Sequence, residues 1–231
     1  MTPGTALDRG LEEMALALPA DARGQLLQYV ELLVKWNRTY NLTAIRDPLA
    51  MVTQHLLDSL AVLPHLPLAP DAGRIADAGS GAGLPGIPLA IARPGWRVAL
   101  AESSQKKAAF LRQAAIELAL PNVEVHEGRV ESWRPAALFD VVTSRPFAAL
   151  GDFAGACRHL LAPGGVLAAM RGAAPEALDP RCSLVRLRVP FLEALDARAA
   201  DALHQHADAA VGQLQHAHDE GDGPHAVDVL G

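Results

Sequence analysis

Cysteine is scarce in this 231-residue chain, and long apolar runs are missing from it. Its two cysteines, Cys157 and Cys182, are too few for a disulfide framework, which suits a reducing compartment. No apolar run approaches the ~20 residues that a membrane-spanning helix needs, and the first residues lack the basic-then-apolar order of a signal peptide. The sequence therefore predicts a cytoplasmic protein without a membrane partner.

Positive charge is also in short supply. The chain has 20 lysines and arginines against 26 aspartates and glutamates, a formal net charge of −6. Phosphate contacts supply most of the affinity of nucleic-acid-binding proteins, so this balance argues mildly against such a partner. A global sum does not exclude a local basic face, however.

Hydrophobic residues make up 50% of the chain and charged residues 20%, the balance of a soluble globular protein. The length suits one full-sized domain with a modest extension. The pattern divides it into a helical N-terminal extension at 1–70, a core at 71–192 and a C-terminal tail at 193–231.

The N-terminal extension has the pattern of three helices. Pro19 ends the first run of apolar residues at helical spacing, and Asp21 is the expected cap of the second helix. A third helix is expected over 51–63, and the prolines that follow it form a linker.

The core alternates short apolar strands with helices. This order predicts a parallel sheet with right-handed crossovers, whose ligands sit at the carboxyl ends of the strands. The expected strands are 74–78, 97–101, 123–127, 139–144 and 166–170, and the expected helices are 86–92, 105–119 and 150–161.

The end of the chain is less regular. A sixth strand is expected at 184–189, a helix over 193–220, and 225–230 alternates like a short strand. Histidine pairs in this region lie two positions apart, so they do not share a helix face, and no cysteine or carboxylate cluster completes a zinc site. No metal site is predicted.

A glycine-rich loop follows the first strand of the core: Asp77-Ala78-Gly79-Ser80-Gly81-Ala82-Gly83-Leu84. Glycine serves where the backbone turns sharply and approaches a ligand closely, because a Cβ would clash. Glu102 closes the second strand, where its carboxylate is placed to accept hydrogen bonds from both ribose hydroxyls of a nucleoside. The core therefore predicts a nucleotide-type cofactor.

Two cofactors fit this pattern. Gly81, Gly83 and Gly86 satisfy G-x-G-x-x-G, and Glu102 lies near the ~20-residue offset of a dinucleotide fingerprint. A nicotinamide-dependent oxidoreductase is therefore the competing hypothesis to a protein that binds S-adenosylmethionine. The loop alone does not decide between them.

Three features favour S-adenosylmethionine. The carboxylate of Asp77 would meet the cationic end of this molecule, directly or through water, but would repel a pyrophosphate. Pro85 and Pro88 crowd the helix start that offers free amides to a phosphate. Finally, the strand at 140–144 and the Pro-Gly-Gly turn within 161–167 are typical of methyltransferases.

Five motifs in a fixed order make the match more specific. Together they resemble the RsmG family, the bacterial 16S rRNA guanine-N7 methyltransferases formerly called glucose-inhibited division protein B, over roughly residues 25–190. The motifs are Trp36-Asn37-Arg38-Thr39-Tyr40-Asn41-Leu42-Thr43, His55-Leu56-Leu57-Asp58-Ser59, Gly83-Leu84-Pro85-Gly86-Ile87-Pro88-Leu89, Lys107-Ala108-Ala109-Phe110-Leu111-Arg112 and Ser144-Arg145-Pro146-Phe147.

The resemblance implies an α/β fold of the Rossmann-like class I methyltransferase type, with a mostly parallel sheet and a helical N-terminal extension. It implies methyl transfer from S-adenosylmethionine to N7 of one guanine in the decoding-region loop of 16S rRNA, which leaves S-adenosylhomocysteine. The partner is the 16S rRNA, either free or within the small ribosomal subunit or an assembly intermediate. The enzyme is expected to be a monomer.

The resemblance also assigns residues by position. Polar side chains of the N-terminal helices, Asn41, His55 and Ser59, are expected beside the pocket. Arg145, Lys106 and Asn41 are the expected catalytic residues, which orient the base and a phosphate. The expected cofactor-binding residues are Asp77, Gly79, Gly81, Gly83, Leu84, Glu102, Ser103, Ser104, Val130, Glu131 and Arg145.

The chain departs from the family at two places. Pro146 follows Arg145 where the family usually has alanine, and it restrains Arg145 to extended geometry. The family ends in a β-hairpin that 193–231 does not match, although 225–230 can substitute for its last strand.

Guanine N7 carries an in-plane lone pair, so its methylation needs positioning and no general base. A local basic face would reconcile the net negative charge with an RNA partner, and binding to RNA should then weaken as salt rises. The residues of this expected face, the basic rim, are Lys35, Arg38, Arg46, Lys106, Lys107, Arg112 and Arg145.

A third hypothesis, beside the methyltransferase and the oxidoreductase, is an inactive cofactor-binding module that docks on ribosomes.

Overall fold

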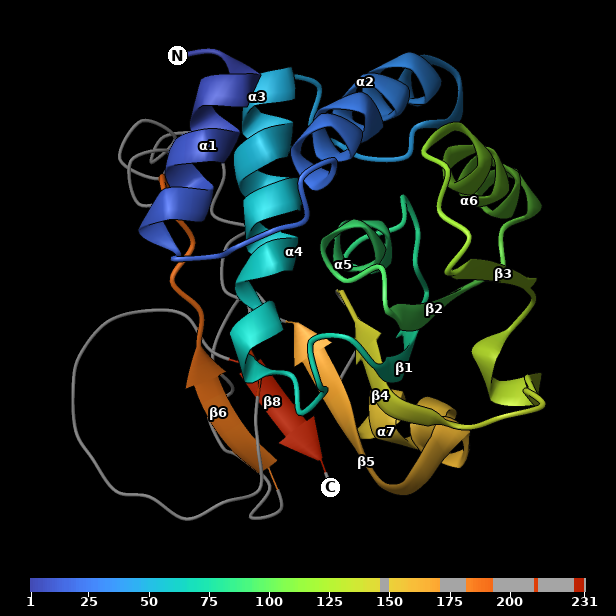
Figure 1. Ribbon diagram of the computed structural model, residues 1–231. Coiled ribbons are helices and arrows are strands. Elements are labelled where there is room, and N and C mark those ends of the chain that lie inside the picture. Colours follow the sequence, from blue (N-terminus) through green and yellow to red (C-terminus); the bar gives the residue numbers. More distant parts are fainter. Residues whose placement is uncertain (146–149, 171–181, 193–209, 212–226, 231) are drawn as a thin grey trace.

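The structure, a computed structural model, describes residues 1–145, 150–170, 182–192, 210–211 and 227–230 (Figure 1). Within these ranges a sheet of eight strands has the order β3-β2-β1-β4-β5-β8-β6-β7. The strands are β1 (Gly73–Ala78), β2 (Trp96–Glu102), β3 (Val123–Glu127), β4 (Phe139–Ser144), β5 (Leu161–Met170), β6 (Cys182–Arg186), β7 (Ala210–Val211) and β8 (Val227–Leu230).

The first five strands pair in parallel, as the alternation of strands and helices predicts. The chain reverses direction along the sheet beside β1, because β2 lies on one side of it and β4 on the other. Ligands of such sheets bind where the strand order reverses, at the carboxyl ends of the strands. The residues that follow β1, β2 and β4 are therefore placed for a site.

Helices cover both faces of the sheet (Figure 1). The N-terminal helices, α5 and α6 lie on one side, and α7 lies on the other. The helices are α1 (Pro3–Glu13), α2 (Ala22–Tyr40), α3 (Pro48–Met51), α4 (Asp58–Ala61), α5 (Gly86–Ala92), α6 (Gln105–Glu117) and α7 (Leu150–Cys157).

The two faces carry side chains of different size. Along β1, Ile75 belongs to a large apolar core that also holds Leu7 of α1 and Leu26 of α2. Ala76 points to the other face, into a smaller core that holds Phe153 of α7. Because the extension and the sheet share the larger core, the N-terminal helices are packed as part of the same hydrophobic unit.

One continuous helix, the 48–61 helix, spans residues 48–61 (Figure 1). It joins α3, a π-helical segment over Val52–Leu57 and α4 without a break. The helix begins three residues before the expected start at 51, because Pro48 suits a first helical position and Asp47 caps it. The Asp47 carboxylate accepts hydrogen bonds from two first-turn amides at 3.4 and 3.1 Å.

The expected capping role of Asp21 is wrong. Asp21 stands at the N-cap position of α2, but its side chain makes no capping hydrogen bond. Its backbone has helical angles, φ −85° and ψ −14°. A capping side chain needs the extended backbone that turns its oxygen toward the free amides.

The Pro-Gly-Gly turn expected within 161–167 lies inside β5, which begins at Leu161. Gly164 has a φ of +80°, and the register between β4 and β5 shifts opposite this stretch. The helix expected at 150–161 ends at Cys157, and a 3-10 turn fills Arg158–Leu160. The sharp turn is therefore accommodated as an irregularity of a long strand.

The C-terminal strands are antiparallel additions to the sheet. β8 lies between β5 and β6 and pairs with both. β6 begins two residues before the strand expected at 184–189. The helix expected over 193–220 is wrong at 210–211, which form β7; the rest of that stretch lies outside the described residues.

Candidate functional site

The glycine loop connects β1 to α5 at the carboxyl edge of the sheet. Gly79, Gly81 and Gly83 have φ angles of +70°, +57° and +90°, a left-handed backbone that favours glycine. A Cβ on Gly79 would meet nothing within 4 Å, so space lies open beside this residue. A Cβ on Gly83 would lie 2.6 Å from Ile87 Cδ1. The loop thus has one face open and the other packed against α5.

Glu102 holds this loop from the end of β2. Its Oε2 accepts a hydrogen bond from Gly81 N–H at 2.8 Å, and its Oε1 accepts one from Ser104 N–H at 2.7 Å. Each carboxylate oxygen has a second lone pair, so Glu102 can accept further hydrogen bonds from a ligand. The expected placement of Glu102 beside the loop is confirmed.

Asp77 lies beneath the loop and is fully buried. Its Oδ2 accepts a hydrogen bond from Gly86 N–H at 3.1 Å, while its Oδ1 lies within hydrogen-bond geometry of no partner in the described part of the chain. Burial raises the pKa of this carboxyl to about 7, against the opposing effects of Gly86 N–H, of the Ser80 hydroxyl and of the charge on Arg145. The Gly86 N–H at the start of α5 is therefore already hydrogen-bonded to Asp77, although a pyrophosphate would need it free.

Two more buried polar atoms near the ends of these elements have no hydrogen-bond partner among the described residues: Ser59 Oγ of α4 and Thr143 Oγ1 of β4. Thr143 stands directly opposite Asp77 in the register of the parallel strands, so their side chains share one face of the sheet. Buried polar atoms without partners are rare and mark places where a water molecule or ligand is held.

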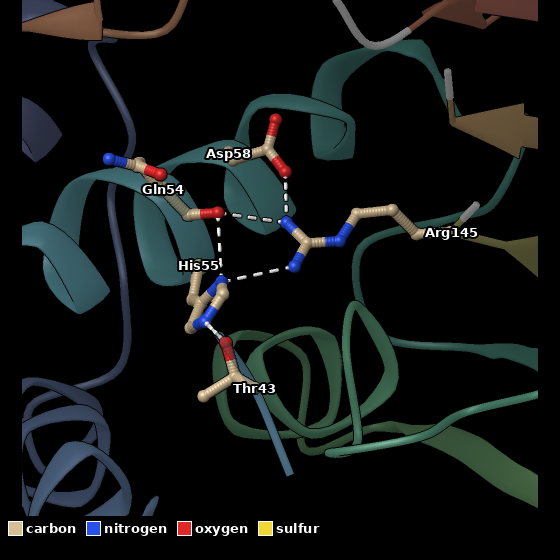
Figure 2. A network of polar contacts seen from close by, with 5 residues as sticks. All are labelled: Thr43, Gln54, His55, Asp58 and Arg145. Carbon is tan, nitrogen blue, oxygen red and sulfur yellow. Dashed lines mark hydrogen bonds and ion pairs between the residues drawn. The ribbon is translucent and has the colours of Figure 1, made fainter. Parts of the chain in front are cut away.

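Arg145 follows β4 and points toward the 48–61 helix (Figure 2). Its Nη1 donates to the Gln54 carbonyl oxygen at 2.9 Å and to the Asp58 carboxylate. Its Nη2 lies 3.1 Å from His55 Nδ1. Arg145 therefore fixes this helix at the carboxyl end of β4, and its contact with a cofactor stays a prediction.

The two neighbours of His55 Nδ1 call for opposite tautomers. Arg145 Nη2, at 3.1 Å, can only donate, whereas the Gln54 carbonyl oxygen, at 3.0 Å, can only accept. His55 Nε2 shares a hydrogen bond of 2.8 Å with Thr43 Oγ1. Asn37 holds the same segment, because its side-chain amide bonds the Thr43 carbonyl oxygen at 2.9 Å. A continuous polar network joins α2, the 48–61 helix and the end of β4.

The other expected site residues lie in the segments that follow α2, β1, β2 and β3. Ser103 is exposed, and Ser104 is the N-cap residue of α6. Leu84 and Val130 are buried, and Glu131 is exposed and paired with Arg129 at 2.9 Å. Asn41 is exposed at the end of α2, where its left-handed φ of +48° ends the helix. Lys106 is exposed in the first turn of α6.

Sequence reasoning did not assign roles to Asn37, Thr43, Gln54 and Asp58, which complete the network around Arg145. Asp58 lies three residues after His55, so the two share one face of a helix. That spacing, within a motif that already contained His55, is the signal that identifies Asp58. Gln54 contributes its main-chain oxygen, which no residue type reveals.

Helices α2 and α6 run antiparallel beside this site. Gln25, early in α2, donates its side-chain amide to the Leu118 carbonyl oxygen at the end of α6, over 2.8 Å. Trp36, late in α2, packs against Phe110, whose ring centroid is 5.5 Å away. The last turn of α2 therefore lies toward the first turn of α6, which follows Glu102 and the serines.

This arrangement gathers part of the basic rim. Lys35 and Arg38 are exposed in the last turns of α2, and Lys106 is exposed at the start of α6. Two other members have acidic partners, because Arg112 pairs with Glu127 at 2.8 Å and Arg145 with Asp58. The exposed positive charge is therefore carried mainly by the two helix ends.

Comparison with known proteins identifies the family. Residues 22–180 match the model of the GidB family, described as rRNA small subunit methyltransferase G. The chain belongs to that family. The Ribosomal RNA small subunit methyltransferase G of Burkholderia thailandensis is 51% identical over 199 residues, which cover 81% of this chain and 86% of that protein. The proteins of the same name from Burkholderia mallei and Burkholderia pseudomallei are 50% identical over the same lengths.

Solved structures align less closely. Coclaurine N-methyltransferase with N-methylheliamine and SAH has a TM-score of 0.45 and 12% identity, covering 80% of this chain and 51% of that one. The DhpI–SAH complex has a TM-score of 0.42 and 20% identity, covering 73% and 74%. The methyltransferase family of this chain therefore rests on the sequence matches, and its α/β fold on its own sheet order.

Within the described part of the chain, no three histidine, cysteine, aspartate or glutamate side chains gather as metal ligands would. No helix in the same residues has the length and apolar character needed to cross a membrane.

Proposed function

We propose that this protein transfers a methyl group from S-adenosylmethionine to N7 of one guanine in the decoding-region loop of 16S rRNA. The observation that carries the proposal is the match of residues 22–180 to the rRNA small subunit methyltransferase G family. That range contains the glycine loop, Glu102, Asp77 and the network of Arg145. The protein acts as a monomer in the cytoplasm, on 16S rRNA that is either free or within the small ribosomal subunit or an assembly intermediate.

The residues present fit the methyl donor. The open side of Gly79 allows close approach to the backbone, and Glu102 retains acceptor capacity for two ribose hydroxyls. The orphaned Oδ1 of Asp77 supplies negative charge on the side of the cationic methionine end. Ser103, Ser104 and the Val130–Glu131 segment are the residues that we assign to the adenosine.

A nicotinamide dinucleotide fits less well. Its pyrophosphate needs free amides and an absence of negative charge at a helix N-terminus. Here Gly86 N–H is already bonded to Asp77, and Pro85 and Pro88 have no N–H to offer. The start of α5 therefore disfavours the competing hypothesis of an oxidoreductase.

Methyl transfer to guanine N7 requires only that the protein position the methyl donor and the base. S-adenosylmethionine, when bound, supplies an electrophilic methyl group on its sulfonium, and guanine N7 supplies a lone pair that needs no deprotonation. Holding the two in line lowers the barrier by roughly 7 kcal/mol or more. Arg145 fixes the 48–61 helix as a wall at the end of β4, while Asn41 and Lys106, exposed on neighbouring helix ends, orient the base and a phosphate.

Recognition of the RNA falls to the basic rim. Lys35 and Arg38 near the end of α2 and Lys106 at the start of α6 are exposed, so these two helix ends supply local positive charge although the chain as a whole is acidic. Contacts of this kind release counterions, which makes binding salt-dependent.

Isothermal titration separates the two cofactors. We expect S-adenosylhomocysteine to bind and NAD not to bind. The reverse result would reject the proposal.

Mass-spectrometric mapping tests the reaction itself. 16S rRNA from a strain that lacks the enzyme, as free RNA and in small subunits, is incubated with enzyme and labelled donor. Label on a single guanine of the decoding-region loop, at N7, is expected. A chain that binds small subunits but transfers no label would instead be the inactive docking module.

A further inference from the structure

We propose that Tyr29 is a positioning residue of the methyl-donor loop, so that helix α2 forms part of the donor site. The inference rests on the proposed function, because it takes the loop over 79–84 as the part of the chain that holds the donor.

Tyr29 reaches the loop from the middle of α2. Its side chain is fully buried, and its hydroxyl donates a hydrogen bond to the Ala82 carbonyl oxygen at 2.5 Å. A buried hydroxyl needs a partner, and this one finds it on the backbone of a loop 53 residues further along the chain. Tyr29 thereby links the N-terminal extension directly to the glycine loop.

The bond fixes the orientation of one peptide unit. In a trans peptide the C=O and the following N–H point in opposite directions in one plane. The Ala82 C=O accepts from Tyr29, and the Gly83 N–H on the other side of the same unit donates to the Ser80 carbonyl oxygen at 2.7 Å. Both ends of this peptide unit are therefore held.

The neighbouring residues make this clamp matter. Gly81 and Gly83 flank Ala82, and glycine adopts backbone conformations closed to other residues. The peptide unit that joins Ala82 to Gly83 therefore rotates easily about the glycine φ when its bonds are removed. Glu102 holds Gly81, and Tyr29 holds the carbonyl oxygen of Ala82.

The hydroxyl of Tyr29 is itself held in a fixed place. α2 is anchored to α6 by the Gln25 bond to Leu118 and by the packing of Trp36 on Phe110. These anchors lie on both sides of Tyr29 along the helix. The position of the Ala82 carbonyl is consequently set by a frame outside the loop.

The first test compares Tyr29→Phe with Tyr40→Phe. Tyr29→Phe removes only the hydroxyl, and we expect S-adenosylhomocysteine to bind about fivefold to tenfold more weakly, the effect of one net hydrogen bond. The KM for the methyl donor should rise by the same factor, with kcat and the KM for rRNA within about twofold of wild type. Tyr40→Phe makes the same substitution at a 39% exposed position of the same helix and should leave donor affinity unchanged.

Two outcomes overturn the inference. One is wild-type affinity for S-adenosylhomocysteine in Tyr29→Phe. The other is an equal loss in both variants, which would show an effect that is not specific to Tyr29. If wild-type protein itself binds no S-adenosylhomocysteine, the proposed function fails instead, so the two failures are distinguishable.

A second measurement, made on the protein with Tyr29 in place, does not depend on the folding of Tyr29→Phe. The chain has two tyrosines, so 3-fluorotyrosine labelling gives two fluorine signals, and Tyr40→Phe assigns them. Tyr40 is the last residue of the same helix and is 39% exposed. Addition of S-adenosylhomocysteine should shift the signal of Tyr29 and leave that of Tyr40 in place; an unmoved Tyr29 signal contradicts the proposal.

Discussion

Asp77 and Gly86 share a buried hydrogen bond of 3.1 Å that joins the end of β1 to the start of α5. The contact is tight, because a Cβ on Gly86 would lie 2.9 Å from Asp77 Oδ2 and 2.2 Å from Leu100 Cδ2. One carboxylate oxygen is thereby used inside the fold, and the other has no hydrogen-bond partner among the described residues.

The raised pKa of Asp77 makes stability depend on pH. The pKa of its carboxyl is about 7 in the folded protein, against 3.8 for an ordinary aspartate as in the unfolded chain. Between these two pH values the folded protein therefore binds more protons than the unfolded one. The contribution of Asp77 is therefore fully favourable below about pH 4 and is lost as pH rises to about 7, at up to roughly 1.4 kcal/mol per pH unit.

Asp77→Asn provides the measurement of this effect. Asparagine keeps the shape and an oxygen for Gly86 N–H but cannot ionise. In urea unfolding at pH 5 and pH 8, we expect the free energy of unfolding of the variant to fall less with pH than that of the wild type. Parallel pH dependences for the two proteins would show that Asp77 ionises normally.

Glu102→Gln should weaken donor binding. Glutamine keeps one acceptor oxygen, but its amide nitrogen only donates. One of the two hydrogen bonds from Gly81 N–H and Ser104 N–H is therefore lost, and the ribose loses an acceptor. We expect the Kd for S-adenosylhomocysteine to rise about 10- to 100-fold in calorimetry, the range for hydrogen bonds to a charged group.

The matched control is Glu127→Gln. Glu127 ends the neighbouring strand β3 and pairs with Arg112 on the surface. Its substitution should leave the Kd unchanged. Equal losses in the two variants would refute a specific role for Glu102.

Asp58→Asn should destabilise the protein through Arg145. The side chains of this ion pair are only 18% and 14% exposed, so the substitution leaves a largely buried cation without its counter-charge. We expect a loss of about 2 kcal/mol in the free energy of unfolding, below the value for a fully buried pair because some solvent reaches it. The surface pair of Arg23 and Asp8 is the comparison: Asp8→Asn should give no resolvable change.

The basic rim should contribute to RNA binding and not to donor binding. Replacing Lys35 and Arg38 with alanine should raise the KM for rRNA and lower the slope of log affinity against log salt by about 0.7 to 0.9 for each phosphate that the variant no longer binds. Calorimetry with S-adenosylhomocysteine should match the wild type. An unchanged salt slope would place the RNA elsewhere.

The five parallel strands and the glycine loop were predictable because their signals are local. Alternating strands and helices define the crossovers, and three glycines within five residues mark the sharp turn before α5. Glu102 was found for the same reason, since the end of a strand has a known place in such sheets.

The partners of Arg145 were not predictable in this way. Gln54 and Asp58 lie 91 and 87 residues before it, and periodicity carries no information on contacts between distant segments. The position of β8 between β5 and β6 has the same origin, because alternation of apolar residues indicates a strand but not its neighbours.

The shared core of the N-terminal helices and the sheet limits how the molecule can be divided. A fragment that began at residue 71 would expose to water the apolar sides of α5 and α6 that pack against α2, and would lose the part of the larger core that Leu7 and Leu26 supply. Such a fragment would aggregate rather than fold. The N-terminal helices and the sheet should therefore unfold together, in a single cooperative transition.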